Sequence, residues 1–102
     1  MTIALSDRDL LRQQCLIDGA WTGSPSIAVT DPATGETIAS IPDLGVAETQ
    51  AAIAAADAAL PAWRAKTAAE RSRILRRWFD LLITHQDDLA MILTREQGKA
   101  LA

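Results

Sequence analysis

The sequence predicts an α+β fold in which a small antiparallel β-hairpin unit is followed by two helices. Short turn motifs between apolar runs predict the β unit: Asp18-Gly19, and the run Asp31-Pro32-Ala33-Thr34-Gly35. An alanine-rich tract over residues 51–59 predicts the first helix, and a long apolar stripe after Thr67 predicts the second.

Length and composition limit what these 102 residues can be. With 49% apolar and 23% charged residues and a net charge of −3, the chain suits one small folded domain. It has no apolar run of the ~20 residues that a membrane span needs, and its start lacks the pattern of a secretory signal. One cysteine, Cys15, forms no internal disulfide, which is typical of a reducing compartment.

The β unit is expected over residues 14–43, after a polar arm over residues 1–13. Asp18-Gly19 favours a tight hairpin, because glycine adopts positive φ freely. A second turn is expected at residues 23–26, a strand at 27–30, the turn at 31–35, and an alternating strand at 37–41 that Pro42 ends. A hairpin unit of this size is hardly stable alone and needs a partner surface.

The first helix is expected from Gly45 to about Leu60, where Pro61 ends or kinks it. The second is expected from Thr67 to Gln97, because Thr67 and Glu70 form a capping box and Gly98 is a natural C-cap. Unbroken, that helix is ~46 Å long at 1.5 Å per residue. Its apolar stripe comprises Ile74, Leu75, Trp78, Leu81, Leu82, Leu89, Ile92 and Leu93.

The apolar stripe of this second helix is too long for the first helix of the two-helix unit, residues 44–102, to cover. The alanine-rich helix, packed antiparallel, is expected to cover about half of the stripe, because alanine buries little area. The remainder implies a partner or further chain, so the arm, the β unit and the two-helix unit are together expected to be an incomplete part of one larger domain. Alone, they are expected to be oligomeric or partly molten.

Candidate chemical residues are sparse. Cys15 precedes an apolar run without a visible base, and His85 lies near the apolar stripe, so a structural role is favoured for both. Asp87 and Asp88 diverge by about 100° on a helix and do not converge on one substrate, so a solvated helix face is expected for both. The five glycines form no phosphate-binding loop. No catalytic, cofactor-binding or metal-binding residue is predicted.

Charge leaves one further alternative open. Residues 1–50 carry a net charge of −5 and residues 51–102 a net charge of +2, with bases concentrated over residues 64–77. A basic helix that binds nucleic acid is conceivable there. A solvated helix surface is favoured, since these bases alternate with apolar positions.

Several short segments recur in a recognisable order: residues 17–21, 29–36, 38–39, 42, 51–59, 61–64, 69–71, 74–75 and 94–99. Their order and spacing resemble the amino-terminal segment of aldehyde dehydrogenases, over about residues 13–102. Within that family the similarity is strongest to the bacterial succinate-semialdehyde dehydrogenase type, carried by residues 60–82. Asp31 stands where the family usually has Asn, and Ala100 where it usually has Pro.

The resemblance implies part of a cytoplasmic, homo-oligomeric oxidoreductase about five times this length, which oxidises an aldehyde to a carboxylate with NADP or NAD. It implies that these residues begin the α/β cofactor-binding domain and that the rest of the chain is their partner. The family's catalytic Cys, Glu and Asn lie downstream, and Cys15 does not match the catalytic position. In some members a backbone carbonyl here helps to hold a monovalent cation, which maps to Val29 or Thr30.

Three hypotheses follow. The first is that the chain is the amino-terminal part of an aldehyde dehydrogenase, inactive alone, which binds neither nucleic acid nor a membrane. The second is a stand-alone helical protein-interaction module, and the third is the basic-helix nucleic-acid binder.

Overall fold

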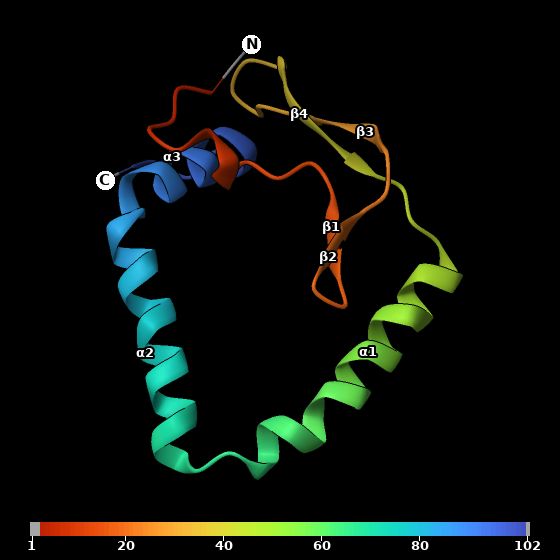
Figure 1. Ribbon diagram of the computed structural model, residues 1–102. Coiled ribbons are helices and arrows are strands. Elements are labelled where there is room, and N and C mark those ends of the chain that lie inside the picture. The colour runs from red at the N-terminus through yellow and green to blue at the C-terminus, as the bar shows by residue number, and fades with distance from the viewer. Residues whose placement is uncertain (1–2, 102) are drawn as a thin grey trace.

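Two separate two-stranded antiparallel sheets form the first part of the chain. The computed structural model describes residues 3–101, and Figure 1 shows its elements. A short 3-10 helix, η1 (Arg8–Leu10), precedes β1 (Cys15–Ile17) and β2 (Ala20–Thr22), which pair with each other. The second sheet pairs β3 (Pro25–Thr30) with β4 (Thr37–Pro42).

The residues of the two predicted turns join the paired strands of each sheet, as the sequence predicts. Asp18 and Gly19 both take positive φ, 52° and 73°, and place Ile17 opposite Ala20. In the longer turn, the Asp31 carboxylate accepts the Ala33 N–H at 2.8 Å, and the Gly35 N–H reaches the Asp31 carbonyl at 2.7 Å. The expected turn over residues 23–26 is too long, because Pro25 already belongs to β3 and pairs with Pro42.

Three helices follow rather than two. The helix α1 (Val46–Ala65) continues four residues beyond Pro61, and α2 (Ala68–Thr84) and α3 (Gln86–Gln97) are separate helices. The predicted capping box is present at α2: Glu70 N–H to Thr67 Oγ1 is 3.2 Å, and Thr67 N–H to Glu70 Oε2 is 2.7 Å. Gly98 ends α3 in the left-handed conformation with φ of 84°.

The expected continuous helix over Thr67–Gln97 is therefore wrong. It breaks at His85, whose φ of −102° and ψ of 16° leave the helical region. The expected antiparallel packing of the first two helices is also wrong: α1 and α2 diverge from their connection as a V (Figure 1). Arg71 fixes the corner, since its Nη1 donates to the carbonyls of Arg64 and Lys66 at 3.2 and 3.0 Å.

The buried residues gather around α3, not between α1 and α2. Among the described residues, Ile3 and Ile38 are the buried hydrophobic side chains, at 3% and 7% exposure. The radius of gyration is 16.6 Å, larger than the ~13 Å of a compact chain of this length. The molecule is open and flat, with extents of 48 × 34 × 19 Å.

Gly23 provides a test of the β unit. A Cβ there would lie 2.8 Å from the Pro42 Cβ, at a φ of +92°, whereas a Cβ on Gly19 meets open space. We expect Gly23→Ala to lower the free energy of unfolding by about 1–3 kcal/mol more than Gly19→Ala, because only the first adds a clash. Urea unfolding of both variants measures this difference, and equal losses would contradict the packing described.

Candidate functional site

The sequence-level candidates for chemistry lie on different elements. Cys15 is half-buried in β1, beside a hollow that it lines with Leu44, Glu48 and Thr49. His85 lies at the junction of α2 and α3. The structure does not bring these candidates together as a nucleophile and base, and the favoured structural reading of each still stands as a prediction.

The solvated face expected for the acidic pair on α3 is correct for Asp87 and wrong for Asp88. Asp87 is exposed, whereas Asp88 is 9% exposed and faces the amino-terminal arm. The Asp88 carboxylate accepts the Ser6 N–H at 2.9 Å through Oδ1 and the Asp7 N–H at 2.8 Å through Oδ2. These bonds from the Ser6 and Asp7 amides lower the pKa of Asp88 against the opposing effect of its burial.

A second carboxylate anchors the other end of α3. Asp31 is 5% exposed, and its Oδ2 accepts the Arg95 Nε at 2.8 Å. The Ala33 amide and the Arg95 guanidinium lower the pKa of Asp31, while burial opposes them. Gly98 lies close to Pro32, since a Cβ on the glycine would be 3.0 Å from the proline Cγ. The β3–β4 turn and the carboxyl end of α3 are thus held together.

These two anchors were missed at the level of sequence. Asp31 occupies a position where the resembled family usually has Asn, and in this structure its partner is Arg95. That substitution was a readable signal, but it did not identify a partner 64 residues away. Asp88 gave no signal, because the apolar pattern continues through it.

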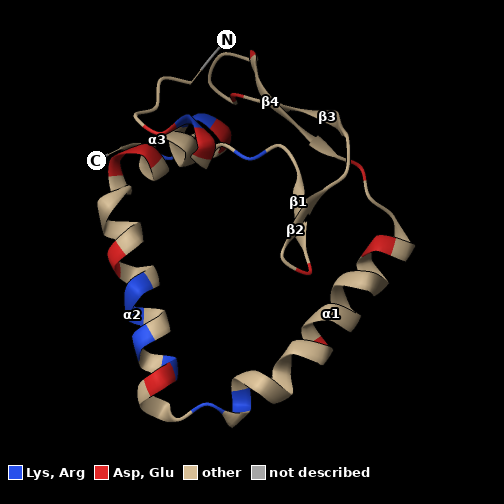
Figure 2. Cartoon of the chain, in the orientation of Figure 1, with Lys and Arg blue, Asp and Glu red and all other residues tan. Residues whose placement is uncertain are grey.

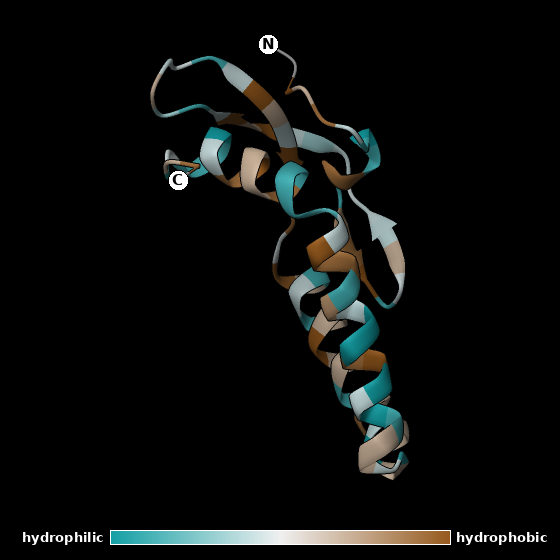
Figure 3. Ribbon diagram, turned by 90° about the vertical axis from the view of Figure 1, so that its left-hand side faces the viewer, coloured by the Kyte–Doolittle hydropathy of each residue, from teal (hydrophilic) through white to brown (hydrophobic). Residues whose placement is uncertain are grey.

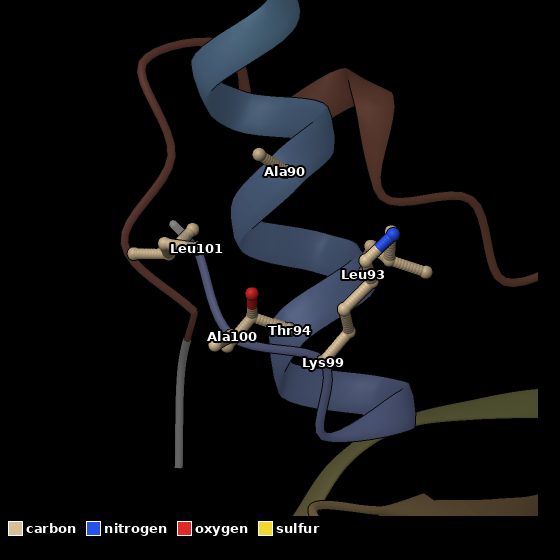
Figure 4. A pocket seen from close by; sticks show the side chains of 6 residues that line it. All are labelled: Ala90, Leu93, Thr94, Lys99, Ala100 and Leu101. Carbon is tan, nitrogen blue, oxygen red and sulfur yellow. The ribbon is translucent and has the colours of Figure 1, made fainter.

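The hollows on the described surface do not assemble a catalytic set. Figure 4 shows one between α3 and the segment that returns along it after Gly98. Thr94 and Lys99 contribute its polar side-chain atoms, beside Ala90, Leu93, Ala100 and Leu101. Within residues 3–101, no group of three or more His, Cys, Asp or Glu side chains could hold a metal ion. No described helix is long and apolar enough to cross a membrane.

Two of the four arginines on α2, Arg71 and Arg76, are engaged within the chain. Figure 2 shows the basic residues of this helix together in its middle, with acidic residues toward both ends. Arg71 holds the corner with α1, and Arg76 pairs with Asp80 at 3.4 Å and lies over the Phe79 ring at 4.8 Å. The basic positions of α2 alternate with apolar ones, and Glu70 and Asp80 lie on either side of them, which is typical of a solvated helix surface.

Comparison with known proteins connects this arrangement to one family. The profile of the aldehyde dehydrogenase family matches residues 21–102. The chain is 59% identical over 101 residues to glutarate-semialdehyde dehydrogenase of Pseudomonas aeruginosa. It is 55% identical over 101 residues to the NADP-dependent succinate-semialdehyde dehydrogenase of Escherichia coli. Both alignments cover 96% of this chain and 21% of the relative, so the chain spans about a fifth of their length.

Solved structures agree with the sequence comparison. An NADP-dependent enzyme of Escherichia coli superposes with a TM-score of 0.92 at 54% identity. An aldehyde dehydrogenase of Brucella melitensis biovar abortus 2308 does so with a TM-score of 0.92 at 50% identity. Each match covers 96% of this chain and 21% of the other. The α+β arrangement of small sheets followed by three helices is therefore the arrangement found in these structures.

The anchoring carboxylates predict how stability depends on pH. Both have a lower pKa in the fold than in the unfolded chain, so between these values the unfolded chain binds more protons. Their contribution is complete above the ordinary carboxyl range and is lost as pH falls through the folded pKa values, below about 4. We expect the melting temperature to fall over this range, and to fall less in the double variant Asp31→Asn, Asp88→Asn. Equal falls in the two proteins would contradict the assignment.

Proposed function

This chain belongs to the aldehyde dehydrogenase family, and we propose that it supplies the amino-terminal part of an enzyme that oxidises a semialdehyde to a carboxylate with NADP or NAD. The observation that carries the proposal is identity above 50% to two semialdehyde dehydrogenases over 96% of the chain. The substrate class proposed is a short aldehyde with a second, anionic end, which the names of both relatives share. The whole enzyme is proposed to be cytoplasmic and homo-oligomeric.

The described residues do not fit a nicotinamide cofactor by themselves. Glycines with positive φ lie singly in turns or at the end of α3, not in a loop that cradles phosphates. The connection from β4 to α1 does place Gly45 before a helix. Its amide N–H already bonds the Glu48 carboxylate at 3.0 Å, and that negative charge opposes a phosphate at the same site. We assign cofactor binding and catalysis to other parts of the enzyme.

The exposed apolar surface supports the same reading. Side chains that prefer burial stand in solvent along both arms of the V: Ile53 is 65%, Trp78 62% and Ile83 55% exposed. Figure 3 shows hydrophobic residues along the helices that project away from the sheets. Extended apolar patches of this kind mark interfaces. We propose that the remainder of the enzyme covers them, and that the arm, the β unit and the helical unit belong to one larger domain.

A chimera tests the proposed function. The matched amino-terminal fifth of the Pseudomonas aeruginosa relative is replaced by this chain, and oxidation of glutarate semialdehyde is measured by NADPH or NADH formation. We expect activity within about tenfold of the parent enzyme, a change of ~1.4 kcal/mol in barrier height, because the same contacts are supplied. The relative lacking that fifth is the control. A soluble, well-folded chimera without activity would refute the proposal.

The two hypotheses, an enzyme fragment and a stand-alone module, predict different behaviour of the isolated chain in solution. If α1 and α2 await cover, the isolated chain self-associates, and Trp78→Lys shifts it toward the monomer in sedimentation velocity. Ser72→Lys is the matched control, since it adds the same charge on α2 at an exposed polar position. A monomeric parent that unfolds in one sharp transition would favour the independent module.

A further inference from the structure

The break between α2 and α3 has only a weak cause in its own sequence. The Thr84 hydroxyl donates to the Asp80 carbonyl at 2.9 Å, a bond that destabilises a helix slightly. Residues 68–97 contain neither proline nor glycine, and the apolar stripe continues on both sides of His85. His85 also keeps helical bonds in both directions. Its N–H reaches the Leu81 carbonyl at 3.0 Å, and its carbonyl accepts the Leu89 N–H at 3.0 Å. Sharp helix bends have identifiable causes, and the Thr84 bond weakens the helix only slightly. The contacts that other segments make with the junction are therefore the main candidates for the cause.

The amino-terminal strap, defined as residues 3–11, passes over this junction (Figure 1). Ile3 anchors its start at 3% exposure. Leu10 lines one apolar hollow with residues from both helices: Trp78, Leu81, Leu82, His85 and Leu89. The strap therefore contacts the end of α2 and the start of α3 together.

Asp88 connects the strap to the start of α3. It is the third residue of α3, where a carboxylate is favoured by the helix amides, and its two oxygens accept strap amides at 2.9 and 2.8 Å. The strap is itself ordered at that point, since the Asp7 carboxylate accepts the Asp9 N–H at 3.0 Å and starts η1. These bonds are separated by 81 and 82 residues in sequence.

We propose that the amino-terminal strap is the device that divides one potential helix into α2 and α3. A continuous helix would give the amides at the start of α3 carbonyl partners in the last turn of α2. The strap opposes this by binding Asp88 and placing Leu10 against both helices. The bend in turn aims α3 at the β3–β4 turn, where Arg95 meets Asp31. This inference concerns the chain itself and does not depend on the proposed enzyme activity.

A distance measurement across the junction tests the proposal. In a Cys15→Ser background, cysteines replace Arg73 on α2 and Glu96 on α3, both exposed, and carry spin labels. The labelled protein is diluted with excess unlabelled chain, so that pulsed dipolar spectroscopy reports distances within one molecule. A continuous helix separates the two Cα positions by about 35 Å, and the bent parent gives a shorter distance.

Two variants release the strap in different ways. Asp88→Ala removes both acceptors of the strap amides. Leu10→Asp puts a charge into the apolar hollow without changing any residue of α2 or α3. Both are expected to lengthen the distance toward about 35 Å with helicity by circular dichroism retained. Asp87→Ala is the matched control, because it makes the same change of helix propensity next to Asp88, and it should keep the parent distance.

Three results would overturn the proposal. These are an unchanged distance in Asp88→Ala and Leu10→Asp, an equal lengthening in Asp87→Ala, and a broad distribution accompanied by loss of helicity. The last would mean that the released segment melts rather than straightens.

Discussion

The arrangement of this chain depends on two carboxylates that tie α3 to segments far away in sequence. Asp88 binds the amides of Ser6 and Asp7 at the first turn of α3, and Asp31 binds Arg95 at its last turn. Both carboxylates are buried and fully engaged, which is the condition under which a buried charge is tolerated. The first bond orders the amino-terminal strap, and the second orders the β3–β4 turn.

The helices α1 and α2 lie outside the region that these two carboxylates hold together. α1 and α2 leave the anchored region as a V, and the Arg71 bonds to the Arg64 and Lys66 carbonyls fix its corner. No buried residue lies in either helix among those described. Helices usually gain most of their stability from packing an apolar face. An enzyme body that covers these faces reconciles the open shape with the family to which the chain belongs.

Local signals in the sequence predicted local structure well. Asp18-Gly19, the Asp31–Gly35 turn, the Thr67–Glu70 capping box and the Gly98 cap all act as their chemistry predicts. The break at His85 was not predictable, because helical periodicity runs through it and its cause lies some 80 residues earlier in the chain. The V was not predictable either, since an apolar stripe indicates that a helix is covered but not by what. The family was indicated by the order and spacing of turn and helix segments, whereas Cys15 and His85, the candidates for chemistry, contributed nothing to it.

Hydrogen exchange of the Trp78→Lys variant of the 102-residue chain, in dilute solution that favours the monomer, tests most directly whether α3 and its two anchors organise the structure. The account predicts that amides of α3, the strap and the β3–β4 sheet exchange at least about tenfold more slowly than those of α1 and of the first turns of α2, because only the former are held by long-range contacts. Uniform protection across all three helices, or faster exchange in α3 than in α1, would contradict it.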